Sequence, residues 1–114
     1  MYLKRLAVVL GAVAVASCSS NPSGPSGGGH STTIFVNSNF FSPTPDTVTA
    51  GNVTFSWASG THNVTWDSGP TTPANSGDKS SGTQVVAVTA GTYQYHCSIH
   101  GLPGSGMHGT IVVQ

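Results

Sequence analysis

The chain has 114 residues, with three Lys or Arg, three Asp or Glu and a formal net charge of zero. This length suits one domain, and so few cations cannot form a basic patch that would hold the phosphates of a nucleic acid. No pair of Asp or Glu lies near the histidines, so the sequence offers no general acid–base pair. Composition therefore argues against a nucleic-acid partner and against an enzyme, and no catalytic residue is predicted.

The N-terminus has the pattern of a targeting segment. A short basic stretch, MYLKR, precedes the apolar run LAVVLGAVAVA, which is too short to span a membrane comfortably. The run ends in VASC, which resembles the bacterial lipoprotein signal, in which the cysteine after a small residue is lipidated. We expect residues 1–17 to be a lipoprotein signal peptide, with Cys18 anchoring the exported protein to a membrane, facing the periplasm or cell exterior. An ordinary secretory signal or an uncleaved anchor is the alternative.

The two cysteines are expected to have different fates. A pair of cysteines in an exported protein usually suggests a disulfide, but lipidation of Cys18 leaves Cys97 without a partner. A lone thiol in an oxidising compartment is a liability unless something occupies it. Residues 18–31, rich in Gly, Ser and Pro, are predicted to be a lipid-anchored flexible tether, in which His30 is solvated.

Strand patterns fill residues 32–114. They begin with TIFV and continue with two short runs in TVTAGNVTFSW, where Val53, Phe55 and Trp57 alternate with polar residues as in a half-buried strand. The segments HNVTW, TQVVAVTAGTYQYHC and GTIVV follow, and a polar loop rich in turn formers covers residues 67–82. Seven or eight short strands with Gly and Pro turns predict an all-β sandwich.

Ligand-type side chains gather near the C-terminus, in YHCSIHGLPGSGMHG. In the strand AGTYQYHC, Tyr93, Tyr95 and Cys97 share one face, so the thiol points inward if the tyrosines face the core. A Gly- and Pro-rich loop is expected to follow, with His100 at its start and Met107 at its end. A Cys-x-x-His pair on such a loop can offer a thiolate and an imidazole to one ion, and Met107 can add a thioether.

His62 completes the predicted site. It lies in GTHNVTW, at the junction of a loop and an alternating strand. Two imidazoles, a thiolate and a weak axial thioether are the donors of a blue-copper electron-transfer site. Soft sulfur favours Cu(I) and imidazole suits both oxidation states, as rapid one-electron exchange requires. The predicted ligands of one Cu(I)/Cu(II) ion are therefore His62, Cys97, His100 and Met107.

Strand phase separates the neighbours Met107 and His108 as candidates for the axial position. The stretch MHGTIVV alternates, so placing Ile111 and Val113 in the core also points Met107 inward. His108 is then expected to face solvent.

The chain resembles the cupredoxins, and specifically small bacterial plastocyanin-like domains. The matching stretches are VTAGNVTFSW, HNV, GTYQYHCSIH and MHGTIVV, which follow the family's order over nearly all of residues 32–114. The resemblance implies a cupredoxin-type Greek-key β-sandwich. It also implies that His62, Cys97 and His100 are copper ligands and that Met107 is axial.

The resemblance assigns two supporting residues as well. Asn63 falls where the family has an asparagine whose side chain bonds across to the residue after the cysteine, here Ser98. Such bonds hold ligand loops together when copper changes charge. The chain departs from the family at three points: His96 replaces an aromatic residue, Ser59 replaces an asparagine, and the loop before Met107 is longer than in plastocyanins.

Together these features predict a membrane-anchored blue (type 1) copper protein that carries single electrons between extracytoplasmic redox partners. We expect a monomer whose partners dock on an apolar rim near His100, Leu102 and Pro103, because the scarce charge allows little electrostatic steering. The alternatives are a copper storage or delivery lipoprotein, a copper enzyme with an open coordination position, and a metal-free immunoglobulin-like adhesion domain.

Overall fold

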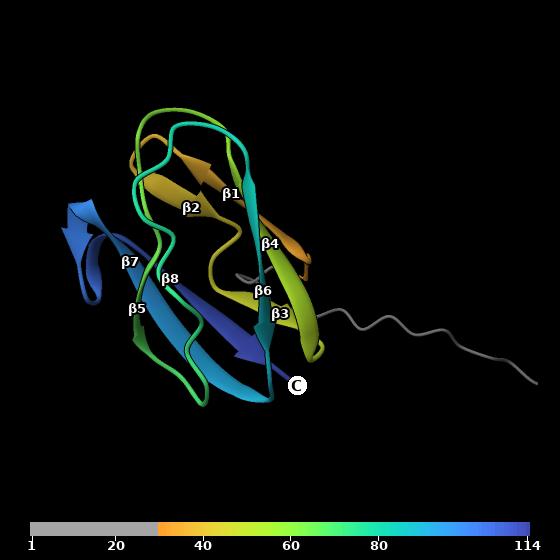
Figure 1. The fold of residues 1–114 in the computed structure, drawn as a ribbon. Coiled ribbons are helices and arrows are strands. Elements are labelled where there is room, and N and C mark those ends of the chain that lie inside the picture. The colour runs from red at the N-terminus through yellow and green to blue at the C-terminus, as the bar shows by residue number, and fades with distance from the viewer. Residues whose placement is uncertain (1–29) are drawn as a thin grey trace, which may run out of the picture.

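The computed structural model describes residues 30–114, which form eight strands in two four-stranded sheets and contain no helix (Figure 1). The predicted signal peptide of residues 1–17, the predicted lipidation site Cys18 and most of the predicted tether lie outside the described residues. In the described part there is accordingly no helix with the length and apolarity needed to cross a membrane.

The first sheet has the strand order β2-β1-β4-β6. It consists of β1 (Thr33–Asn37), β2 (Phe40–Ser42), β4 (Gly51–Trp57) and β6 (Thr83–Val88). Strand β1 pairs antiparallel with β2 and parallel with β4, and β4 pairs antiparallel with β6. The predicted alternation in β4 is confirmed, because its apolar side chains are buried and the residues between them are not.

The second sheet has the order β3-β8-β7-β5. It consists of β3 (Asp46–Val48), β5 (Thr65–Ser68), β7 (Gly91–Leu102) and β8 (Ser105–Val113). Strand β8 pairs parallel with β3 and antiparallel with β7, which pairs antiparallel with β5. Figure 1 shows β5, β7 and β8 on one side of the molecule and β1, β4 and β6 on the other, so the predicted β-sandwich is confirmed.

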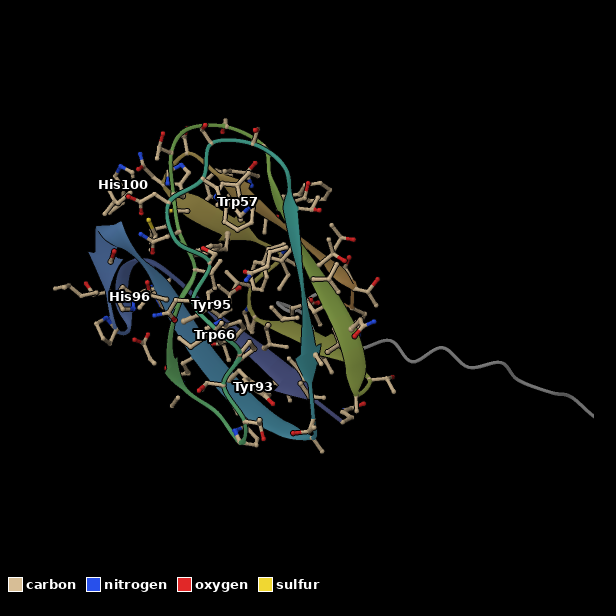
Figure 2. All side chains as sticks on the ribbon, viewed as in Figure 1. Trp57, Trp66, Tyr93, Tyr95, His96 and His100 are labelled. Carbon is tan, nitrogen blue, oxygen red and sulfur yellow. The ribbon has the colours of Figure 1, made fainter. Side chains whose placement is uncertain are left out.

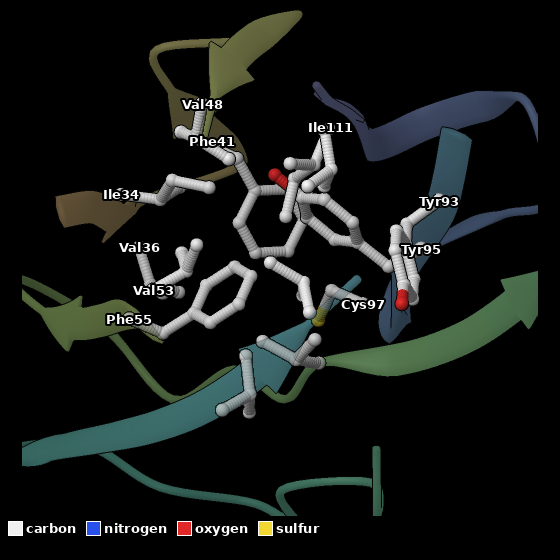
Figure 3. Close-up of a cluster of buried hydrophobic side chains, with 14 of the residues drawn as sticks. Ile34, Val36, Phe41, Val48, Val53, Phe55, Tyr93, Tyr95, Cys97 and Ile111 are labelled. Carbon is white, nitrogen blue, oxygen red and sulfur yellow. The ribbon is translucent and has the colours of Figure 1, made fainter. Parts of the chain in front are cut away.

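Aliphatic side chains and aromatic rings together fill the space between the sheets (Figure 3). The ring of Tyr95 contacts Phe41 and Phe55 edge-on, with centroids 4.7 and 5.2 Å away, an arrangement that aromatic quadrupoles favour. Cys97 belongs to the same buried cluster and is fully buried. Packing of the core therefore also fixes the position of the thiol.

The segment after His100 differs from the expected Gly- and Pro-rich loop. Strand β7 continues to Leu102 and β8 begins at Ser105, so the segment is a β-hairpin whose turn is formed by Pro103 and Gly104. Gly104 has a φ of 73°, and Pro followed by a left-handed Gly is the signature of a type II turn. The hairpin holds its own ends together and carries the exposed residues next to the site.

One additional strand and one strand boundary also differ from the sequence-based expectation. Strand β2 was not predicted, because three residues are too few to show an alternating pattern. The strand expected from HNVTW begins only at Thr65, since the backbone of His62 bonds instead to Lys79 in an isolated bridge.

Candidate metal centre

Three of the predicted ligands meet at one end of the sandwich. The Nδ1 atoms of His62 and His100 lie 3.1 Å apart. The Sγ atom of Cys97 lies 3.9 Å from Nδ1 of His62 and 3.7 Å from Nδ1 of His100. The fold thus brings together a thiol and an imidazole that are 35 positions apart in sequence.

Cys97 reaches this place from the inner face of β7. Tyr93, Tyr95 and Cys97 are buried on that face, as strand phase predicted. The register of β7 against β8 then shifts between His96 and Gly101. Such an irregularity bends the strand and re-aims its side chains, and it lies where the chain passes from the buried thiol to the exposed ring of His100.

His62 is held in the loop before β5. Its backbone exchanges two hydrogen bonds with Lys79, at 3.0 and 2.9 Å, and its carbonyl accepts a bond of 2.9 Å from Nε1 of Trp57. Burial lowers the pKa of His62 below 6.5, the charge of His100 lowers it further, and the nearby backbone of Ser59 raises it in part. The ring is therefore neutral at pH 7, the form that binds a metal.

Asn63 joins the two ligand-bearing segments. Its Nδ2 donates to Oγ of Ser98 at 2.9 Å, and its Oδ1 accepts from the backbone N–H of Ser98 at 2.9 Å. The same amide bonds Asp78 and Thr65, each at 2.9 Å. The contact that the resemblance implied between Asn63 and Ser98 is therefore present, and it links the segment after His62 to the residue after the cysteine.

Met107 and His108 lie on opposite faces of β8. Met107 is buried with Ile111 and Val113, whereas His108 is exposed. His108 pairs with His96 across the sheet, and their chain neighbours Met107 and Cys97 are both buried. The structure thus places the thioether on the buried side of the strand.

The donor set fits one copper ion. Zinc lies about 2.1 Å from a nitrogen ligand and about 2.3 Å from a sulfur ligand, so its donor atoms are about 3 to 4 Å apart. We expect similar separations between the ligands of a copper ion. The measured separations of 3.1, 3.7 and 3.9 Å lie in this range. Two imidazoles, one thiol and a buried thioether suit a type 1 copper ion, whereas hard cations such as Ca²⁺ and Mg²⁺ prefer oxygen.

Apolar residues close to the exposed ligand in sequence are also exposed. Of the three clustered residues only His100 is exposed, and Figure 2 shows it at the same end of the molecule as Trp57. Leu102 and Ile99 are 66% and 46% exposed, and Pro103 is also exposed. The rim that the sequence predicted near His100 is therefore open to solvent.

The pair of His96 with Asp67 was not predicted from the sequence. Nδ1 of His96 lies 2.8 and 2.9 Å from the two carboxylate oxygens of Asp67. His96 faces the outer side of β7 and yet is only 8% exposed. The sequence signal was limited to an unusual residue before the cysteine, and nothing marked Asp67, which belongs to a polar run.

Comparison with solved protein structures identifies the fold. No model of a known protein family matches the chain, and neither does any curated protein sequence. A Cu-containing nitrite reductase from Thermus scotoductus SA-01 matches 90% of this chain with a TM-score of 0.60 and 23% identity, and the chain spans 25% of that protein. Oxidised plastocyanin from Dryopteris crassirhizoma matches 72% of this chain and 99% of its own, with a TM-score of 0.54 and 24% identity.

Amicyanin is similar to this chain to about the same extent as plastocyanin. An oxidised amicyanin variant matches 72% of this chain and 80% of its own, with a TM-score of 0.55 and 27% identity. Eight strands in two sheets match these proteins along most of their length. The chain therefore has the cupredoxin fold of plastocyanin and amicyanin.

Proposed function

We propose that the chain is a blue (type 1) copper protein that carries single electrons between extracytoplasmic redox partners. The observation that carries the proposal is the convergence of Cys97 Sγ with the Nδ1 atoms of His62 and His100 at the end of a cupredoxin sandwich. Similar folds support it, since plastocyanin is described in oxidised and reduced forms and amicyanin in a reduced Cu(I) form.

The chain's own residues have separate roles in this proposal. Bound copper supplies a couple that changes by one electron between Cu(I) and Cu(II). Cys97 and His62 are held by the packed core and by backbone bonds, so their donor atoms keep their places in both states. Met107 would help to hold the ion through its thioether, from the buried face of β8. Exposed His100 offers the route to a partner.

A partner would dock on the rim around that ring. Leu102 and Pro103 are exposed beside His100, and the only cation of the described residues, Lys79, lies over the ring of Trp57. Apolar contact with the rim would therefore contribute more than electrostatic steering. We propose that the protein acts as a monomer and needs no catalytic side chain.

The same proposal includes the anchor. We infer from VASC that residues 1–17 are removed and that Cys18 carries acyl chains, which hold residues 18–31 as a tether at an extracytoplasmic membrane surface. Mass spectrometry of the N-terminal peptide from the native host tests this, with acyl chains on Cys18 as the expected result. An unmodified Cys18 would contradict it and would make a disulfide with Cys97 possible.

Voltammetry combined with a chelator challenge tests the function. An electron carrier should show one reversible one-electron wave and should keep its copper against a weak chelator in both oxidation states. A protein for copper storage or delivery should instead release copper readily, with a poorly reversible wave. The second result would favour the alternative of a copper storage or delivery lipoprotein.

A further inference from the structure

A second pair of histidines lies on the outer face of β7 and β8. His96 pairs directly with His108 across these antiparallel strands. Both side chains project away from the core, because Tyr95, Cys97 and Met107 on either side of them face inward. Directly paired residues have Cβ atoms about 4.5 to 5.5 Å apart, so the two rings begin close together on this face.

Hydrogen bonds determine which nitrogen of each ring is free. Nδ1 of His96 lies 2.8 Å from the carboxylate of Asp67, and Nδ1 of His108 lies 3.0 Å from the carbonyl oxygen of Gly106. An ionised carboxylate and a carbonyl oxygen can only accept a hydrogen bond, so each Nδ1 carries the proton and donates it. In the neutral ring Nε2 then carries the free lone pair, and neither Nε2 has a hydrogen-bond partner within residues 30–114.

This arrangement is the one that metal-binding histidines have in proteins. Such a histidine donates its other N–H to a carboxylate or a backbone carbonyl, which fixes the ring and raises the basicity of the ligating nitrogen. Imidazole nitrogen suits zinc, copper and nickel. The nearby charge is favourable, since Asp67 is negative and the single cation among residues 30–114, Lys79, is engaged with Trp57.

We propose that His96 and His108 bind one divalent late transition-metal ion, of the class of Zn²⁺ and Cu²⁺, through their Nε2 atoms. Asp67 and the carbonyl of Gly106 hold the two rings, and water completes the coordination. This site lies on the opposite face of β7 from Cys97, so it does not depend on whether the buried cluster binds copper.

Zinc is the appropriate probe, because it has no redox chemistry that could disturb bound copper. The protein is loaded with one equivalent of Cu(I) without oxygen, and Zn²⁺ is added while the imidazole nitrogen resonances and the heat of binding are recorded. We expect one further equivalent to bind, with shifts in the Nε2 resonances of His96 and His108 and none in those of His30. Shifts at His62 and His100 would identify zinc in the buried cluster.

Three variants complete the test. His108→Ala removes one ligand from an exposed position and should lower the zinc affinity about tenfold or more, whereas His30→Ala, which removes an exposed histidine elsewhere, should not change it. Asp67→Asn should lower the affinity about 10- to 100-fold, because it removes the carboxylate that holds His96. The proposal is overturned if wild-type protein binds no zinc at these rings, or if His108→Ala binds it as well as wild type.

Discussion

Gly60 lies so close to His62 that a Cβ on Gly60 would come within 2.6 Å of Nε2 of the imidazole. The glycine also has a φ of 77°, in the left-handed region that other residues rarely adopt. Nδ1 on the other side of the ring faces the thiol of Cys97. The position of the donor atom therefore depends on the absence of a side chain at Gly60.

Gly60→Ala should consequently displace the ring of His62 and weaken copper binding. We expect a change in the Cu(II) spectrum and a loss of about 1 to 3 kcal/mol in the free energy of unfolding. Gly82→Ala is the matched control, since Gly82 has a φ of 87° and an added Cβ there meets nothing within 4 Å. That variant should lose about 1 to 2 kcal/mol from backbone strain alone and keep the spectrum of wild type. Equal spectra for both variants would show that His62 has not moved.

Met107→Gln should lower the reduction potential and change the Cu(II) spectrum. The reason is that a weak thioether favours Cu(I), whereas the harder amide oxygen of glutamine stabilises Cu(II). His108→Ala, studied by voltammetry without zinc, should change either property only slightly, because His108 is on the exposed face of β8. If His108→Ala disrupts the copper site and Met107→Leu does not, the axial assignment is wrong.

Asp46 should make the stability of the fold depend on pH. Its Oδ1 accepts a 2.9 Å bond from the N–H of Ser31, while its Oδ2 has no partner within residues 30–114. Burial raises the pKa of the Asp46 carboxyl above its usual 3.8, and the bond from Ser31 lowers it in part. Since the folded-state pKa is the higher one, the stabilisation is fully present below the unfolded-state pKa and is lost as pH rises through the folded-state pKa.

Asp46→Asn should remove this dependence. We expect wild type to lose free energy of unfolding relative to Asp46→Asn as the pH rises from about 3 to 7, by about 1.4 kcal/mol for each unit of pKa difference. Urea denaturation of both proteins across this range measures the difference. A wild-type advantage that grows with pH would mean that the carboxylate is stabilised in the fold.

The longer strands that face the core, such as β4 and β7, could be predicted from the sequence because they show a clear alternation. Tyr93, Tyr95 and Cys97 illustrate this, since period two alone placed the thiol inside. The hairpin after His100 could not be predicted in the same way. Its glycines have no side chains that could alternate between polar and apolar. This paired segment therefore has the composition of a loop.

The contact between Asp67 and His96 could not be predicted from a local sequence pattern, for a different reason. It depends on the register of β5 against β7, and that register shifts between Trp66 and Ser68. A β-bulge adds one residue to one strand, and the alternation of polar and apolar residues does not reveal where it lies. The pairing of His96 with His108 likewise becomes visible only when β7 and β8 are aligned.

The visible absorption spectrum of the protein loaded with Cu(II) tests the central claim most directly. The blue colour of such centres arises from charge transfer between thiolate sulfur and Cu(II), and Cys97 is the only thiol in the cluster. We expect wild type to be intensely blue with one equivalent of copper and to bleach on reduction, and we expect Cys97→Ser to be colourless. A colourless wild type that holds one equivalent of Cu(II) would contradict the proposed blue copper centre.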